Sequence, residues 1–158
     1  MQDGKYGMTA KEYLLQVRKK EAVIARLKYD KENLREILYS IGGTGGSERV
    51  QSSRNNDRFG NVFARIDEKD CLIAEKLEEL VEFKVRVSDE ISTLSDARYI
   101  EILHKRYIRF MSFEQIAVDM GYSYRYVTKM HGYALIEFEK SILGGKGKRG
   151  AQMPHKGA

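Results

Sequence analysis

The segment 124–129 carries side chains whose types and spacing suit contacts with the edges of nucleic-acid bases. An arginine can bond guanine through two hydrogen bonds, and hydroxyl and methyl groups can contact other base edges. Because residues three and four apart share one helix face, these side chains can point away from a core together. We therefore expect the base-reading residues of a double-stranded DNA site to be Tyr124, Arg125, Thr128 and Lys129.

A second set of side chains around this segment suits the phosphate backbone of DNA. Cations, hydroxyl groups and helix N-termini bind phosphate oxygens and fix how a protein lies on the duplex without reading its sequence. The residues that we expect in this role are Ser123, Tyr126, His131, Arg106, Arg109, Lys146, Lys148 and Arg149.

Two short helices joined by a tight turn must position these side chains. Gly121 ends the first helix and tolerates a left-handed backbone, and Ser123 can cap the second helix. Ala117 is small enough to lie where the helices cross. The pattern predicts a helix-turn-helix, although an ordinary helical pair is the simpler alternative. Its apolar positions are Phe113, Ile116, Ala117 and Met120 in the first helix and Val127, Met130, Ala134 and Leu135 in the second.

No residue pattern in the sequence predicts catalysis or a bound metal. The histidines His104, His131 and His155 lack neighbouring Cys, His or Asp residues at the spacing of metal ligands. Serine, histidine and aspartate residues occur, but no signature places them together. The carboxylates follow predicted helix surfaces, where solvated charge is the better explanation. We therefore expect neither an enzyme nor a cofactor.

The composition indicates a helical protein of a reducing compartment. Among 158 residues there is one proline, Pro154, and one cysteine, Cys71. Scarce proline and the lack of strand-like alternation favour an all-α chain. A single cysteine cannot form an internal disulfide, so we expect a reducing cytoplasm. The sequence has no apolar run that could span a membrane and no signal-peptide pattern at residues 1–10.

The net charge of +5 is unevenly distributed along the chain. Residues 1–95 hold 17 basic and 17 acidic side chains, and residues 96–143 hold 7 basic and 6 acidic ones. The segment 144–158 holds four basic side chains and no acid. Most of the excess therefore lies in the last residues, so the prediction of DNA binding depends on the helix-turn-helix pattern more than on net charge.

Two long helices are expected before the helix-turn-helix. Thr9 with Glu12 forms a capping-box signature for the first helix, which should end near Ile41. Asn56 or Asp57 should cap the second helix. Apolar residues follow a seven-residue repeat in both, which predicts a coiled coil. Because a glycine-rich loop at 42–56 joins the helices, we expect them to pair antiparallel as a hairpin.

The repeat also predicts which positions of the hairpin face each other. Folding the chain back on the loop places Lys31 opposite Asp70, as a matched pair within a seam that is mostly apolar and also contains Lys20 and Lys84. Further apolar residues widen the stripe beyond that seam, so we expect a homodimer through the arm or another protein on this surface. The alternative is that the C-terminal part of the same chain covers them. These residues are Val23, Ile37, Val62, Val81 and Phe83.

The sequence therefore predicts an all-α chain of four parts. They are a flexible N-terminus at 1–8, a helical hairpin arm at 9–94, a helix-turn-helix domain at 95–143 and a disordered basic tail at 144–158. Ser95 or Asp96 should cap a helix that supports the helix-turn-helix. Its apolar face should consist of Tyr99, Ile102, Leu103 and Tyr107.

Residues 96–143 resemble the C-terminal domain of bacterial sigma factors, region 4, which binds the minus-thirty-five promoter element. With a helical arm before it, the chain resembles the sigma-like phage and prophage regulators of the RinA and ArpU type. That resemblance implies an activator of late gene transcription that works with host RNA polymerase in the cytoplasm of a bacterial host cell. The matching residues are Leu103–Tyr107, Ser112–Ala117, Gly121–Ser123, Val127 and Ala134–Leu135.

The resemblance to sigma factors is incomplete, and other functions are compatible with the pattern. No segment resembles the sigma domain that melts the promoter, so we do not expect a complete sigma factor. A small terminase-like DNA-packaging protein also joins a helix-turn-helix to an oligomerising helical arm. A third interpretation is a protein-interaction module that binds polymerase without reading DNA.

Overall fold

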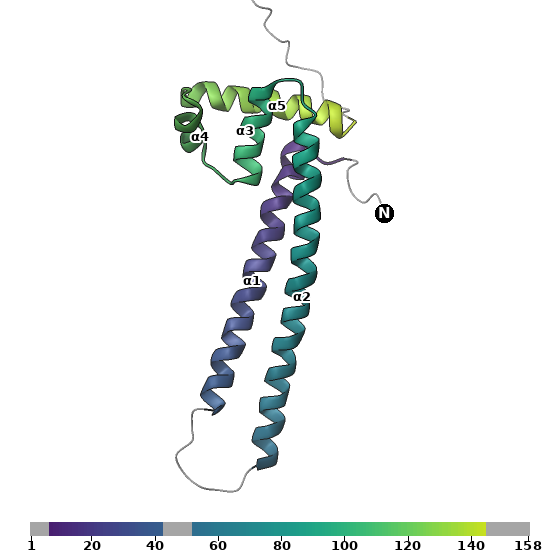
Figure 1. Cartoon of the computed structure of the whole chain (residues 1–158), viewed down its shortest axis with the longest axis vertical. Coiled ribbons are helices and arrows are strands. Elements are labelled where there is room, and N and C mark those ends of the chain that lie inside the picture. Colours follow the sequence, from purple (N-terminus) through teal and green to yellow (C-terminus); the bar gives the residue numbers. More distant parts are fainter. Residues whose placement is uncertain (1–6, 43–51, 145–158) are drawn as a thin grey trace, which may run out of the picture. The chain divides into compact units, whose positions relative to one another are not determined.

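The computed structural model describes residues 7–42 and 52–144, and these residues form helices without any strand. The order is α1 (Ala10–Gly42), α2 (Ser52–Ser92), α3 (Ala97–Leu103), the π-helix η1 (His104–Ile108), α4 (Phe113–Met120) and α5 (Tyr124–Ile142) (Figure 1). The prediction of an all-α chain is confirmed. None of the helices in these ranges is long and apolar enough to cross a membrane.

The start of α1 agrees with the sequence prediction, and the start of α2 differs from it. Thr9 and Glu12 form the expected capping contacts, with the Thr9 backbone N–H donating to Glu12 Oε2 over 2.9 Å. Helix α2 begins at Ser52, whereas the sequence predicted a start at Asn56 or Asp57. Residues 52–56 contain neither glycine nor proline, so the helix can extend through them. The rest of the predicted glycine-rich loop lies outside the described residues.

The chain divides into two compact units. Unit 1 comprises the described parts of Met1–Gln16 and Arg86–Ala158, and unit 2 comprises those of Val17–Val85. Unit 1 therefore contains α3, η1, α4 and α5 together with the first turns of α1 and the last turns of α2. The positions 94 and 95, where the sequence suggested a domain boundary, both lie within unit 1.

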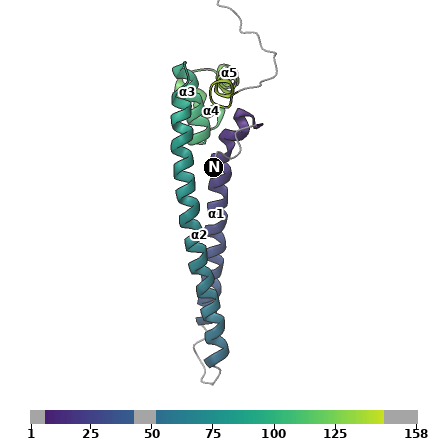
Figure 2. The same ribbon diagram turned by 90° about the vertical axis from the view of Figure 1, so that its right-hand side faces the viewer.

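Unit 2 consists of the remaining parts of α1 and α2, which lie side by side (Figures 1 and 2). Lys31 pairs with Asp70, as the sequence predicted. Asp30 pairs with Lys69 over 3.6 Å, and Lys20 pairs with Glu79 over 3.2 Å. Because the partner numbers rise on one helix as they fall on the other, the two segments run in opposite directions.

Most of the apolar residues predicted beside the seam of unit 2 are at least partly exposed to solvent, and one is buried. Val23, Ile37 and Val81 are exposed, and Val62 is half-buried. Phe83 is buried, in contrast to the expectation that it needs an external partner. Its ring packs within unit 2, where Lys20 Nζ lies 5.7 Å from the ring centre.

Unit 1 has a core in which several large side chains are completely buried. Phe138 of α5 packs against Tyr13 of α1 with 6.1 Å between ring centres. On the same helix, Glu139 Oε2 accepts a hydrogen bond from the Ala10 backbone N–H over 3.0 Å, and a carboxylate at a helix N-terminus is favourable. Glu137 accepts hydrogen bonds from both the backbone N–H and the hydroxyl of Ser95, at 2.7 and 2.8 Å. These contacts join α5 to the segments around residues 10 and 95.

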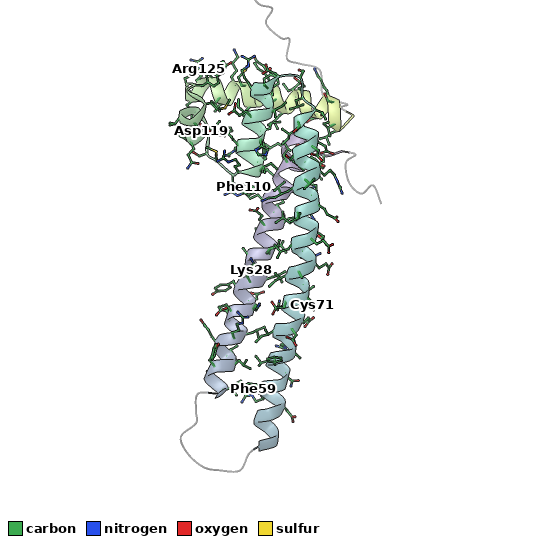
Figure 3. The ribbon with its side chains drawn as sticks, in the orientation of Figure 1. Lys28, Phe59, Cys71, Phe110, Asp119 and Arg125 are labelled. Atoms are coloured by element: carbon green, nitrogen blue, oxygen red, sulfur yellow. The ribbon has the colours of Figure 1, made fainter. Side chains whose placement is uncertain are left out.

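The connection from α3 to α4 departs from a simple helix. Asp96 caps α3 and is one of the two predicted caps. The π-helix η1 follows α3 directly. Phe110 follows with φ of 56°, a left-handed conformation that is uncommon for a residue other than glycine (Figure 3). The Met111 N–H donates to the Lys105 carbonyl over 3.0 Å, so this tight end directs the chain into α4.

Candidate nucleic-acid interface

Helices α4 and α5 are joined by a turn of three residues whose geometry follows from the sequence. Gly121 has φ of 69°, and the Tyr122 N–H donates to the Ala117 carbonyl over 2.9 Å, which ends α4. Ser123 Oγ accepts a hydrogen bond from the Tyr126 N–H over 3.2 Å and so caps α5. Ser112 and Gln115 form a capping box at the start of α4, which sequence reasoning did not identify.

A small apolar core fixes these two helices against α3. Its buried members are Ile102 of α3, Ile116 and Ala117 of α4, and Val127 of α5. Methionine and phenylalanine side chains, which are only partly buried, pack against this cluster. Ala117, which the sequence analysis placed where the helices cross, and Val127, predicted on the apolar face of the second helix, are therefore both within the core.

The first turns of α5 expose three of the four predicted base-reading side chains. Tyr124 is 51% exposed and packs edge-on against Phe113, with 6.3 Å between ring centres. Arg125 is exposed on the first turn (Figure 3), and Lys129 is exposed one turn later. Thr128 is half-buried, and its hydroxyl donates to the Arg125 carbonyl over 3.0 Å. The hydroxyl hydrogen of Thr128 is therefore engaged within α5, while its oxygen can still accept a hydrogen bond.

Arg98 is a residue near this surface that sequence reasoning missed. Its Nη1 donates to the Tyr126 hydroxyl over 2.8 Å, and its Nη2 pairs with Asp96 over 2.6 Å. The Tyr126 ring also lies 4.7 Å from the Tyr122 ring, centre to centre. Tyr126, predicted as a phosphate contact, therefore links α3 to α5. No local signal in the sequence brings Arg98 to a residue 28 positions later.

His131 does not lie on the open side of α5 where the sequence analysis placed it. Its Nε2 lies 3.0 Å from the Tyr107 hydroxyl, and its ring is 4.9 Å from the ring of Phe113. Burial, with smaller effects of Arg106 and Lys11, lowers the pKa of His131 to about 4, so the ring is neutral near pH 7. A neutral, packed histidine is poorly suited to bind phosphate. Its position four residues after Val127 and three before Ala134 could have revealed this.

The basic side chains before the turn that were predicted to contact phosphate differ in exposure and in their partners within the fold. Arg106 lies 4.5 Å over the ring of Phe113, and its Nη1 donates to the Met111 carbonyl over 2.8 Å, so this cation stabilises the fold. Arg109 is exposed. Lys105 is largely buried between Glu101 and Asp119, at 2.6 and 2.7 Å, and these partners raise its pKa. Lys146, Lys148 and Arg149 lie outside the described residues.

The charge around the turn is one-sided. The segment 120–136 includes Arg125 and Lys129 but no aspartate or glutamate. The nearest acids on α5, Glu137 and Glu139, accept the hydrogen bonds from Ser95 and Ala10 described above. Nearby acids outside this segment include Asp96 and Asp119, which pair with Arg98 and Lys105. A segment with cations and aromatic rings and without acids suits contact with a polyanion. Within the described ranges, no cluster of three or more His, Cys, Asp or Glu side chains could hold a metal ion.

Comparisons with known proteins provide no relative for this chain. No family model, curated protein or solved structure matches it.

Proposed function

We propose that this protein is a sequence-specific DNA-binding transcription regulator, in which α4 and α5 form a helix-turn-helix and α1 and α2 form a hairpin arm. The observation that carries the proposal is the exposure of Tyr124, Arg125 and Lys129 on the first turns of α5, directly after a three-residue turn. A recognition helix presents its N-terminal residues to base edges in the major groove. Ser123 and the first backbone N–H groups of α5 would then bind phosphate.

The resemblance to sigma region 4 leads us to propose an activator of late phage transcription that works with host RNA polymerase. Region 4 lies at a promoter beside polymerase, so a chain of this kind needs a second surface for protein contacts. Val118 on α4 is 84% exposed, more than any other large apolar side chain in the described ranges. An open valine on the helix before α5 suits contact with a protein rather than with DNA.

Selection of bound fragments from the source genome tests the DNA proposal. The full chain is incubated with sheared genomic DNA at about 50 mM and 200 mM salt, and the retained fragments are sequenced. Phosphate contacts weaken with salt for all DNA alike, whereas base contacts continue to favour one site. We expect one or a few promoter regions to be enriched more strongly at the higher salt concentration. Uniform coverage of the genome at both concentrations would contradict sequence-specific binding.

Shortening the arm tests the proposed role in activation. Phe138 and Glu139 pack on residues 10–13, so removal of all residues before 95 would damage the core of unit 1. A better variant replaces residues 28–73 with a short glycine-serine loop and keeps unit 1 intact. We expect it to prefer the same DNA site, with weaker binding, and to lose activation in a transcription assay even at saturating protein. Full activation at saturation would show that the arm is only a scaffold.

The exposed Val118 also favours a second candidate, a module that binds polymerase without reading DNA. Substitution of Val118 by Ser distinguishes the two functions, because this side chain lies outside the proposed base-reading set. Under the first proposal the variant keeps DNA affinity and loses activation. If the wild-type chain binds polymerase but no DNA at low salt, the second candidate is the better one.

A further inference from the structure

The two flanks of unit 2 differ in character, and one of them is richer in large apolar side chains. Lys31 and Asp70 lie in the seam, and the residues directly before them, Asp30 and Lys69, pair with each other. Residues that lie whole heptads before or after Asp30 and Lys69 are therefore on this same flank. Val23 and Ile37 lie one heptad before and after Asp30. On α2, Val62 lies one heptad before Lys69, Lys76 lies one heptad after it, and Phe83 lies two heptads after it and is buried within unit 2. We call Val23, Ile37 and Val62, which are not buried, the apolar flank.

The apolar flank is incompletely covered within unit 2. Val23 is 48% exposed and Ile37 is 47% exposed, while Val62 is half-buried. The seam beneath is also open, since Phe63 is 52% exposed and Leu77 is 39% exposed. The opposite flank carries mainly charged or small side chains, namely Glu21, Lys28, Arg35, Asp67 and Ala74, with Val81 as its large apolar member. Two helices alone do not form a closed core. Beside the seam, Val23, Ile37 and Val62 are at least partly open on this flank, and Val81 is open on the other.

The charge of the two helices indicates what covers this flank. Residues 17–41 of α1 carry seven basic and four acidic side chains, whereas residues 57–85 of α2 carry five basic and eight acidic ones. The segments therefore have net charges of +3 and −3. A second copy of unit 2 offers the same two charges, so α1 of one copy can pack against α2 of the other with complementary fields.

We propose that two copies of this chain join through their apolar flanks into a four-helix bundle whose twofold axis runs along the helices. This axis places α1 against α2 of the partner, where opposite net charges meet. It also forms an alternating ring of two Asp30 and two Lys69 side chains, and a layer of two Ile37 and two Val62 side chains. A perpendicular axis would instead place α1 against α1 and α2 against α2, where like net charges meet. The bundle does not depend on the proposed DNA binding.

The oligomeric state of the full chain is the first test. Sedimentation equilibrium should show a dimer for the wild-type chain. The double variant Val23→Ser/Ile37→Ser should dissociate at least about 100-fold more readily, because four apolar side chains leave the interface. Tyr39→Ser/Val85→Ser is the matched control, since these exposed side chains directly follow seam positions and point away from the flank. A monomeric wild-type chain, or equal losses in both double variants, would overturn the proposal.

Disulfide trapping in the full chain tests the direction of the axis. Cys71 is first replaced by Ser, and then Ile37→Cys and Val62→Cys are introduced into separate copies. Under mild oxidation the mixture should give a cross-linked dimer that contains one copy of each, because the axis along the helices makes these positions neighbours. Each variant alone should give little, because identical positions lie diagonally across the bundle. Cross-linking of Ile37→Cys with Val23→Cys instead would indicate the perpendicular axis and contradict the proposed geometry.

Discussion

Unit 1 and unit 2 have similar apolar content in sequence but bury it very differently. The largest completely buried side chains include Phe138, Leu14, Ile91, Ile102 and Leu103, all in unit 1. Among the described residues of unit 2, only Val17, at its edge, belongs to that group. Several short helices that meet from different directions enclose side chains fully. Two long helices that lie side by side bury side chains only along the line where they touch. Closed cores therefore arise within unit 1, and unit 2 leaves apolar surface for a partner.

Matched phenylalanine truncations give the largest expected difference between the units. Phe138→Ala should lower the free energy of unfolding by about 3–5 kcal/mol, because a fully buried ring leaves a cavity. Phe63→Ala should cost less than about 1 kcal/mol, since that ring is already 52% exposed. Urea unfolding at low protein concentration, where a dimer would dissociate, measures both. Equal losses would contradict the difference in packing between the units.

Acid sensitivity should be concentrated in unit 1 through His131. Its folded pKa of about 4 lies below the ordinary value of 6.5, so the unfolded chain binds the proton more readily between these values. Stability is then fully present above pH 6.5 and falls on acidification through that window. Between pH 6.5 and 5 the wild-type chain should lose about 1.5 kcal/mol more than His131→Gln.

Thermal unfolding of both proteins at a series of pH values measures this difference. The pH range stops at 5 because the carboxylates of Asp96 and Asp119 have lowered pKa values and titrate only at more acidic pH. Parallel stability curves for the wild-type chain and the variant would show that His131 is not responsible for the acid loss.

The smallest effect is expected for the ion pair in unit 2. Lys31 is mostly covered, whereas Asp70 is about half exposed, so solvent screens their interaction. A double-mutant cycle with Lys31→Met and Asp70→Asn should give a coupling of about 0.2–1 kcal/mol. A control cycle of Lys31 with the distant Glu78 should give none. A coupling of zero in both cycles would mean that the pair does not fix the register of the two helices.

Local sequence signals predicted the parts of the fold that depend on neighbouring residues. Thr9, Asp96 and Ser123 are caps, and Gly121 has the left-handed backbone expected at the end of α4. The seven-residue repeat predicted the partner of Lys31, because facing positions follow from the period once the chain is folded back on the loop.

Features that depend on tertiary contacts were not predictable in the same way. The π-helix η1 includes Lys105, whose partner Asp119 is 14 positions later. Phe110 adopts a left-handed backbone conformation that is uncommon for phenylalanine. The inward position of His131 was accessible from its spacing, but its residue type suggested a surface role. At the candidate site, sequence reasoning identified the exposed side chains and missed Arg98, which reaches Tyr126 only in the folded chain.

The most direct test of DNA reading by α5 compares two cations of that helix. Arg125 lies on its first turn, and Lys140 is an exposed cation about 22 Å further along. Fluorescence titrations should use the selected site and random DNA at several salt concentrations. Arg125→Ala should weaken binding to the selected site by about 1–3 kcal/mol and leave random DNA much less affected, while Lys140→Ala changes neither by more than a few tenths. Equal losses on both DNAs for Arg125→Ala, or the same losses for Lys140→Ala, would contradict base reading by this face of α5.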